Sequence, residues 1–202
     1  MKMSINRYFT YSLSGILKLI ISTIRTKLFY KNAKIIRFPF DIRGKKYISL
    51  GTGFTTGFNC RLEAYPVNKQ SIVLIFGSNV QMNDYVHITA MESVIIGNNV
   101  LMASKIYISD CTHGNYEGDI LDSSPEEAPI NRKYSTSPVI IGDNVWIGES
   151  VSILPGTSIG KGTIIGANSV VTKDIPEFVI AVGIPAKPIK RYNFEIKQWE
   201  RI

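Results

Sequence analysis

His113 is one of only two histidines in this chain of 202 residues. It follows a stretch of regularly spaced aliphatic residues and precedes a long segment, residues 114–138, in which that spacing lapses. An imidazole titrates near neutral pH and is well suited to accept a proton there. A positioned general base typically contributes about 10²–10⁴-fold to a rate. The placement of His113 between a regular segment and an irregular loop predicts a catalytic base, and a histidine that only caps a turn is the alternative.

Other reactive side chains lie near His113 in the sequence or share its place in the repeat. Asp110 precedes His113 by three residues and could orient its ring or bind a substrate hydroxyl. His87 could act as a second base or contact substrate, against the simpler reading of a surface corner residue. Cys111 could serve as a nucleophile activated by the neighbouring imidazole, although a thiol at a repeat position is more often structural. Cys60 occupies an inward place and is predicted to belong to the core.

The regular segments share a period of six residues. From Ile141 the chain divides into the units IGDNVW, IGESVS, ILPGTS, IGKGTI, IGANSV and VTKDIP. The first place is always aliphatic, and the fifth is always small or β-branched. Similar units occupy residues 96–113 and 76–93, with a degraded copy at 50–61. This internal repetition is too long to be a chance pattern, and it predicts a repeat architecture.

A period of six fits neither an α-helix nor one long strand, but it fits a short β segment followed by a turn. The first-place aliphatic residue then points inward, and glycine is favoured near the corner. Three units close one triangular coil of about 18 residues, and stacked coils bury a ladder of like residues. The sequence therefore predicts a mainly β fold, a parallel β-helix of hexapeptide repeats with a protruding loop at about 114–138.

The predicted organisation has three parts. Residues 1–43 form an N-terminal helical segment, residues 44–176 form the β-helix, and residues 177–202 form a C-terminal segment. Within the first part, residues 4–30 are predicted to form one or two amphipathic helices. The apolar stretch 13–24 contains Lys18, is shorter than the ~20 apolar residues of a membrane span, and lacks a cleavage pattern. This segment is predicted either to pack on the protein or a neighbouring subunit, or to rest on a membrane surface.

Charge and composition narrow the function classes. The net charge of +7 favours an anionic partner, but no nucleic-acid-binding motif accompanies it. Two separated cysteines favour a reducing compartment, so a cytoplasmic location is predicted. A zinc hydratase would need three histidine ligands, and this chain has two. We therefore predict no metal requirement and no nucleic-acid partner.

The hexapeptide units, together with the segments IYISDCTHG and PVIIGDNVWIG, resemble the hexapeptide-repeat acyltransferases over about residues 44–191. That resemblance implies a left-handed β-helix, homotrimers with active sites between subunits, and acetyl-coenzyme A as acyl donor. It also implies that His113 is the general base of a direct transfer to an acceptor hydroxyl. Asn83 stands where the galactoside-type enzymes carry an asparagine near the reacting hydroxyl, and it could stabilise an oxyanion. A ladder or turn asparagine is the alternative.

The same resemblance implies a coenzyme A site along a groove between coil stacks. Trp146 would line the thioester end, followed by Gly148, Glu149 and Ala167, although Glu149 replaces a smaller residue of the galactoside-type enzymes. Residues matching those that meet the phosphate-bearing half are Thr172, Lys173, Lys187 and Lys190. For the lysine residues of the tail, an ordinary solvated basic segment is the alternative. The cationic cluster would give the excess positive charge a specific role, the binding of a polyphosphate.

The resemblance to O-acetyltransferases of surface polysaccharide synthesis suggests a saccharide acceptor. The galactoside-type enzymes carry acidic residues in the neighbourhood of Met91, where this chain has Ala90 and Met91, with Glu92 one position further on. This difference argues against free galactosides. A lipid-linked saccharide would place the enzyme at the inner face of the membrane, within reach of its basic N-terminal helix. An N-acetyltransferase acting on an amino sugar is the nearest enzymatic alternative, and a solenoid used for binding or as a scaffold is the non-enzymatic one.

Overall fold

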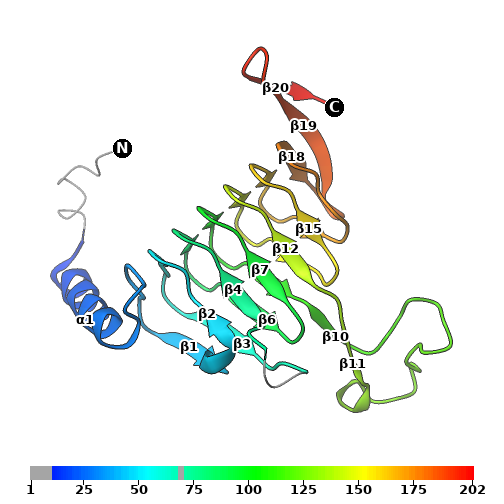
Figure 1. The fold of residues 1–202 in the computed structure, drawn as a ribbon, viewed down its shortest axis with the longest axis horizontal. Helices are drawn as coiled ribbons and strands as arrows, with labels where there is room; N and C mark the ends of the chain where they lie inside the picture. Colours follow the sequence, from blue (N-terminus) through cyan, green and yellow to red (C-terminus); the bar gives the residue numbers. More distant parts are fainter. Residues whose placement is uncertain (1–10, 68–70) are drawn as a thin grey trace.

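The protein folds into a prism of stacked triangular coils (Figure 1). The computed structural model describes residues 11–67 and 71–202. Parallel strands from successive coils form three sheets, which we call faces A, B and C in the order in which the chain visits them. This architecture is the parallel β-helix that the hexapeptide period predicted, with the left hand that the family resemblance implied. One helix lies at its N-terminal end and a hairpin at its C-terminal end.

Each face is a ladder of short strands. Face A contains β5 (Gln81–Met82), β8 (Leu101–Met102), β13 (Trp146–Ile147), β16 (Ile164–Ile165), β18 (Val179–Val182), β19 (Lys187–Asn193) and β20 (Gln198–Arg201). Face B contains β1 (Phe40–Arg43), β3 (Cys60–Ala64), β6 (His87–Ala90), β9 (Tyr107–Ser109), β14 (Ser152–Ile153) and β17 (Val170–Val171). Face C contains β2 (Ile48–Ser49), β4 (Leu74–Phe76), β7 (Val94–Ile96), β12 (Val139–Ile141) and β15 (Ser158–Ile159). The chain turns from face A to face B at the AB edge, and from face B to face C at the BC edge.

The core is the inward ladder predicted from the repeat. The first-place residues are buried: Ile141, Ile147, Ile153, Ile159, Ile165 and Val171. Each pairs in register with its counterpart in an adjacent coil, so that Ile147 lies between Met102 and Ile165. Full burial of one such side chain contributes about 1.5–3 kcal/mol. The repetition of one apolar place therefore stabilises every coil in the same way.

Corner geometry explains the other places of the repeat. The fourth-place residues of five successive units have positive φ: Asn144, Ser150, Gly156, Gly162 and Asn168. Glycine and asparagine adopt this left-handed conformation at low cost. At the second place, a Cβ added to Gly148 would lie 2.5 Å from the backbone nitrogen of Ala167 in the next coil. Glycine is needed there because successive coils stack backbone against backbone.

The prism starts earlier than the predicted boundary at residue 44. Strand β1 already pairs with β3 on face B, and Ile35 forms a parallel bridge with Thr55. Sequence inspection missed this first coil because its units do not carry the glycine and aliphatic spacing of the later ones. At the other end, β18 continues face A before the chain reverses into the antiparallel strands β19 and β20.

One helix, α1 (Leu13–Phe29), covers the N-terminal end of the prism (Figure 1). The Ser12 hydroxyl caps it by accepting from the Gly15 N–H at 3.2 Å. This confirms a helix in the predicted segment; residues 4–10 of that segment lie outside the described ranges. Within those ranges, no helix is long and apolar enough to cross a membrane.

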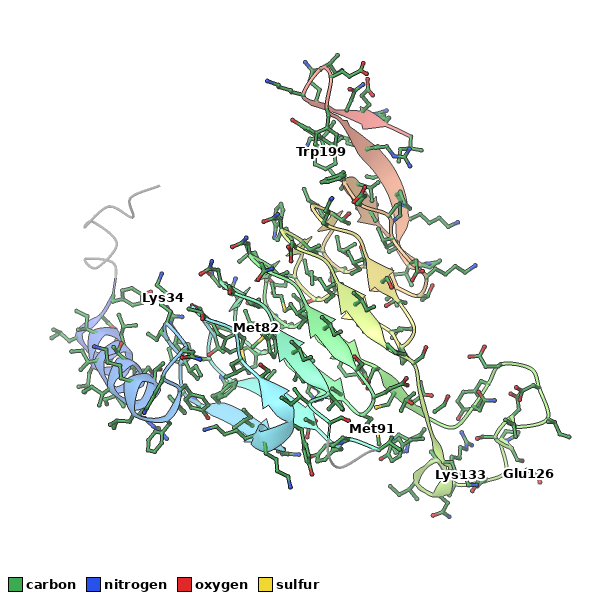
Figure 2. All side chains as sticks on the ribbon, in the orientation of Figure 1. Lys34, Met82, Met91, Glu126, Lys133 and Trp199 are labelled. Atoms are coloured by element: carbon green, nitrogen blue, oxygen red, sulfur yellow. The ribbon has the colours of Figure 1, made fainter. Side chains whose placement is uncertain are left out.

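The predicted loop leaves the prism at the BC edge after β9. It begins with β10 (Cys111–His113) and returns through β11 (Tyr134–Thr136), and these strands pair antiparallel. Figure 2 shows Glu126 and Lys133 in this excursion, well away from the stacked coils. Since Val139 then pairs with Val94 in the register of face C, the insertion leaves the ladder undisturbed.

Candidate active site

His113 lies at the start of the loop, on a short hairpin rather than on the coil itself. It pairs with Tyr134 of β11, and the two rings are 4.6 Å apart between centroids, inclined by 48°. The imidazole is otherwise exposed. Tyr134 therefore restricts the ring on one side and leaves its nitrogen atoms accessible to a substrate.

The backbone of His113 is fixed by two residues that the sequence reasoning missed. The Tyr116 hydroxyl donates to the His113 carbonyl oxygen at 2.5 Å, and Arg132 Nη1 donates to the Tyr116 hydroxyl at 2.8 Å. Arg132 also donates to the carbonyl oxygens of Glu127 and Pro125 at 3.0 and 3.3 Å. One guanidinium thus joins the far side of the loop to the histidine. No spacing rule links these positions, since the loop is irregular.

Asp110 is not hydrogen-bonded to His113, and the backbone partners of its carboxylate argue against the predicted contact with substrate. Its carboxylate is fully buried and accepts from the backbone N–H groups of Met91, Glu92 and Ser93, at distances between 2.7 and 3.1 Å. Its carbonyl oxygen accepts from Ser137 at 2.8 Å. Asp110 therefore ties the turn of the preceding coil to the point where the loop returns. The sequence suggested catalysis because it showed only the short separation from His113.

A cleft of about 400 Å³ adjoins the His113 hairpin at the BC edge. Thr112 and Gly114, the chain neighbours of His113, line it together with Pro155 and Thr172 of the next two coils. Thr172 is one of the residues predicted to contact the acyl donor. The structure therefore brings one predicted donor residue and the predicted base to the same edge of the prism. Thr172 and the chain neighbours of His113 line the cavity there, and His113 itself does not.

Asn83 lies at a different edge. It follows β5 and precedes β6, so it belongs to the AB edge, where its side chain is exposed. Its carbonyl oxygen accepts from the Cys60 thiol at 3.0 Å. One side of a coil contains about six residues, so the two edges are on the order of 15–20 Å apart. A single chain does not bring Asn83 and His113 together.

His87 is held in a polar network on face B, away from His113. Its Nε2 lies 2.7 Å from Glu63 Oε2, and Arg61 Nη2 lies 3.3 Å from its Nδ1. Glu63 is only 7% exposed and also accepts from Arg43 at 2.7 Å. Burial by itself would raise the pKa of Glu63, but the hydrogen bond from His87 and the charge of Arg61 outweigh it, so the pKa is lowered. Both ring nitrogens have protein partners, which argues against a second base.

Four of the predicted donor residues gather around the AB edge. Trp146 is half exposed on face A, just before this edge. Its backbone pairs with Leu101 in the preceding coil and with Ile164 in the following one. Gly148 and Ala167 stack directly on each other in successive coils. Glu149 lies beside them, and its Oε1 is 3.6 Å from Lys105 Nζ. This group continues the line of Asn83 along the same edge.

The other predicted donor residues are divided between two places. Thr172 and Lys173 follow β17 and lie at the BC edge, on the side of His113. Lys187 and Lys190 lie on β19, where they pair with Val182 and Ile180 of face A. The predicted site residues therefore form one group on the BC edge and another on face A and the AB edge.

The two cysteines differ in environment. Burial raises the pKa of the Cys60 thiol to about 11, and its side chain is 1% exposed, which confirms that it belongs to the core. Burial also raises the pKa of Cys111, although a hydrogen bond with Ser109 opposes the shift. A thiol that resists ionisation is a poor nucleophile, so Cys111 is unsuited to carry an acyl group. Among residues 11–67 and 71–202, no group of three or more His, Cys, Asp or Glu residues could hold a metal ion.

Comparison with known proteins places this architecture in a family. Residues 138–173 match the family model described as bacterial transferase hexapeptide (six repeats). The chain is 47% identical over 191 residues to WbbJ of Escherichia coli (strain K12), assigned to lipopolysaccharide biosynthesis as an O-acetyl transferase, with 95% of each chain covered. It is 37% identical over 161 residues to the galactoside O-acetyltransferase of the same organism, covering 80% of this chain and 75% of the relative.

Solved structures agree on the fold. A mutant of AntD, an N-acyltransferase from Bacillus cereus in complex with dTDP-4-amino-4,6-dideoxyglucose and coenzyme A, aligns with a TM-score of 0.67. The alignment covers 85% of this chain and 91% of that one at 23% identity. With its stacked hexapeptide coils and its similarity to two acetyltransferases along most of its length, the chain belongs to the hexapeptide-repeat acetyltransferases.

Proposed function

We propose that this protein transfers an acetyl group from acetyl-coenzyme A to a sugar hydroxyl, with His113 as the general base. The observation that carries the proposal is the cleft at the BC edge, because it adjoins the His113 hairpin and includes Thr172. The similarity to WbbJ, over 95% of the chain, supports an acceptor that belongs to a surface polysaccharide or its precursor.

In the proposed reaction the acceptor hydroxyl donates a hydrogen bond to the His113 imidazole. The ring takes the proton while the hydroxyl oxygen forms a bond to the thioester carbonyl carbon. When the tetrahedral intermediate collapses, the carbon–sulfur bond breaks and the imidazolium returns its proton to the leaving thiolate. Asn83 or a backbone N–H would stabilise the oxyanion. No step requires a metal ion or an acylated cysteine.

The donor fits residues that are already in place on the prism. The Trp146 side chain offers an apolar surface for the pantetheine arm. The Gly148–Ala167 stack leaves room beside it, because its only side chain is the Ala167 methyl group. Lys187 and Lys190 offer cations near the C-terminal end for phosphate groups. These positions lie along one line of face A and the AB edge, as an extended ligand requires.

A site shared between neighbouring subunits would bring together the residues of the BC edge and those of face A and the AB edge, which are separated within one chain. In a trimer whose subunits face one axis with face B, the BC edge of one chain would lie beside the AB edge of the next. His113 and Thr172 would then meet Asn83 and the Trp146 group across the interface. Closed rotational symmetry repeats the same contact around the axis, and it gives three identical sites. We therefore propose a homotrimer with shared active sites, acting on the cytoplasmic side of the membrane.

The direct test is His113→Ala measured with acetyl-coenzyme A and a panel of saccharide acceptors, with release of the thiol as readout. We expect turnover to fall by about 10²–10⁴-fold, while donor binding, followed by thermal shift, and subunit assembly are retained. His87→Ala is the matched control, because it removes the other imidazole from a network on face B. Turnover of His113→Ala close to that of the unmodified protein would refute the assignment.

The acceptor panel also decides between transfer to oxygen and transfer to nitrogen. It should pair each sugar with its amino-sugar counterpart, so that the two acceptors differ at one position only. We expect acetylation of the hydroxyl compounds. Acetylation confined to the amino sugars would replace the proposed O-acetyltransferase with an N-acetyltransferase and leave the role of His113 as base intact.

A further inference from the structure

Helix α1 attaches to the prism through polar residues and turns its apolar side outward. Its buried residues are Ser22 and Thr26. The Thr26 hydroxyl accepts from the Ile36 N–H at 2.8 Å and donates to the Ser22 carbonyl oxygen at 2.7 Å. The opposite side carries exposed aliphatic residues, which we call the apolar stripe: Leu13, Leu17, Ile20, Ile21, Ile24 and Leu28. This is the reverse of a helix that packs its apolar side on its own protein.

Basic residues border the apolar stripe on both sides. At 3.6 residues per turn, Lys27 falls along one border, and Lys18 and Arg25 fall along the other. The Arg25 guanidinium lies 3.9 Å from the centroid of the Phe38 ring, which holds this cation against the body of the protein. Lys45 adds another cation at the end of the helix, where its Nζ donates to the Phe29 carbonyl oxygen at 3.2 Å.

The net charge of the chain resides in this region. Residues 1–40 contain eight Lys and Arg and no Asp or Glu, whereas residues 41–202 contain fifteen basic and sixteen acidic residues. Residues 1–40 therefore have a charge of +8 and residues 41–202 a charge of −1, which together give the net charge of +7. The lysine residues of the predicted donor site lie in this second part, where basic and acidic residues nearly balance. An apolar stripe in a region of excess positive charge is complementary to a surface that is both apolar and anionic.

We infer that α1 is a docking surface for an anionic lipid bilayer and lies in the plane of its interface. The helix has seventeen residues and no window apolar enough to span a membrane, so it rests on the surface with its stripe among the acyl chains. Lys18 and Lys27 along the borders then reach the headgroups. The inference stands independently of the acetyl transfer reaction.

A second copy of the chain is a poorer occupant of this surface. It would bring the same basic residues to the contact, and like charges would oppose each other. Of the acidic residues in the loop at 114–138, Asp119 and Asp122 accept from loop backbone N–H groups, which leaves Glu117, Glu126 and Glu127 as the carboxylates that a second copy could offer. An anionic bilayer supplies the complementary charge without such competition.

The test is co-sedimentation of the full-length protein with vesicles. One set contains only phosphatidylcholine, and the other also contains about a third phosphatidylglycerol, a composition chosen to give a negative surface. Ile20→Ser/Ile24→Ser removes apolar area from the stripe, and Lys18→Gln/Lys27→Gln removes charge from its borders. Ile196→Ser/Ile202→Ser is the matched control, since both residues are exposed at the opposite end of the prism.

We expect binding to the anionic vesicles only, with loss in high salt. The serine pair should lower the partition coefficient at least tenfold, the glutamine pair should lower it roughly fivefold per charge, and the control should leave it unchanged. Melting curves establish that each variant is folded, and acetyl transfer to a water-soluble acceptor should persist in all of them. Absence of binding by the unmodified protein would overturn the inference. So would a serine pair that alters the oligomeric state but not vesicle binding, because that outcome would assign the stripe to a second copy.

Discussion

The groups that hold His113 act on different parts of the residue. Tyr134 packs against the imidazole ring, whereas Tyr116 holds the carbonyl oxygen and is itself held by Arg132. Tyr116 and Arg132 touch neither of the ring nitrogens, so they are positioning residues. Their contribution depends on keeping the loop folded against its own first strand. A base fixed in this way retains its orientation while its ring stays open to a substrate.

Replacing Tyr116 by Phe tests this positioning role. The change removes two hydrogen bonds of the hydroxyl, to the His113 carbonyl oxygen and from Arg132, each with a net value of about 0.5–1.5 kcal/mol. It should lower kcat by about tenfold and leave KM for the donor nearly unchanged. Arg132→Gln should act in the same direction. Tyr192→Phe on the C-terminal hairpin serves as the control, because its hydroxyl makes no hydrogen bond within the described part of the chain. An unaltered kcat in both loop variants would show that the clamp has no role in catalysis.

At the scale of elements, face B carries a polar network across four coils. Glu63 on β3 links Arg43 on β1 and His87 on β6, and Tyr107 on β9 stands 5.5 Å from the His87 ring between centroids. A nearly buried carboxylate is stable there because each oxygen has partners. The network therefore fastens the N-terminal coils to one another, where the aliphatic ladder of the repeat is least regular.

This network predicts a specific dependence of stability on pH. Because the pKa of Glu63 is lowered in the folded protein, its contribution is present above the usual glutamate pKa of about 4.3. It is lost as the pH falls through the lower folded value. Melting temperatures measured from pH 7 to pH 3 should therefore fall more steeply for the unmodified protein than for Glu63→Gln. Parallel curves would mean that the ionised carboxylate is not stabilising. Glu126→Gln, on the exposed loop, is the control.

The stacking of coils makes a second prediction at this scale. In Gly148→Ala the new Cβ would meet the Ala167 backbone nitrogen at 2.5 Å, whereas in Gly166→Ala the nearest atom, at 2.7 Å, is a Val182 methyl that can rotate away. Both glycines hold the second place of their units on the same edge. We expect Gly148→Ala to cost about 1–3 kcal/mol of unfolding free energy and Gly166→Ala to cost less. Denaturant titration compares them, and equal stability of the two variants would contradict the backbone contact.

On the scale of the whole molecule, the decisive feature is that His113 and Asn83 lie on different edges of one prism. A functional site that uses both needs two chains. Figure 1 shows how the loop between β10 and β11 projects sideways from the coils, and His113 is the last residue of β10. Assembly is therefore part of the proposed mechanism, since each chain supplies half of every site.

Mixing two inactive variants tests shared sites directly. His113→Ala and Asn83→Ala chains should each have low activity as separate homotrimers. When they are unfolded together and refolded, random assembly should restore about a quarter of the sites, because one chain supplies His113 and its neighbour Asn83. Mixing without exchange of subunits is the control. Failure of exchanged trimers to recover activity would place the whole site within one chain.

Much of the fold follows from the sequence alone. The aliphatic residue in every sixth place, the small fifth place and the glycine-rich corners are local features, and each coil repeats them. Their period determined the triangular β-helix, and its interruption after His113 located the loop. The candidate base could be found for the same reason, since a break in a regular pattern is visible without any knowledge of distant contacts.

Tertiary structure decided what depends on contacts between distant residues. Asp110 is a buried anchor for the turn at Met91 because the coils stack, and neither its type nor its separation from His113 revealed this. The apolar stripe on α1 faces outward because the polar side of the helix is bonded to the prism through Thr26 and Ile36. Asn83 and His113 lie on separate edges because their segments connect different pairs of faces. The sequence by itself determined the repeating coil because its pattern is local. Which polar side chains are buried, which way the helix faces and on which edge a residue lies were decided only when the coils packed together.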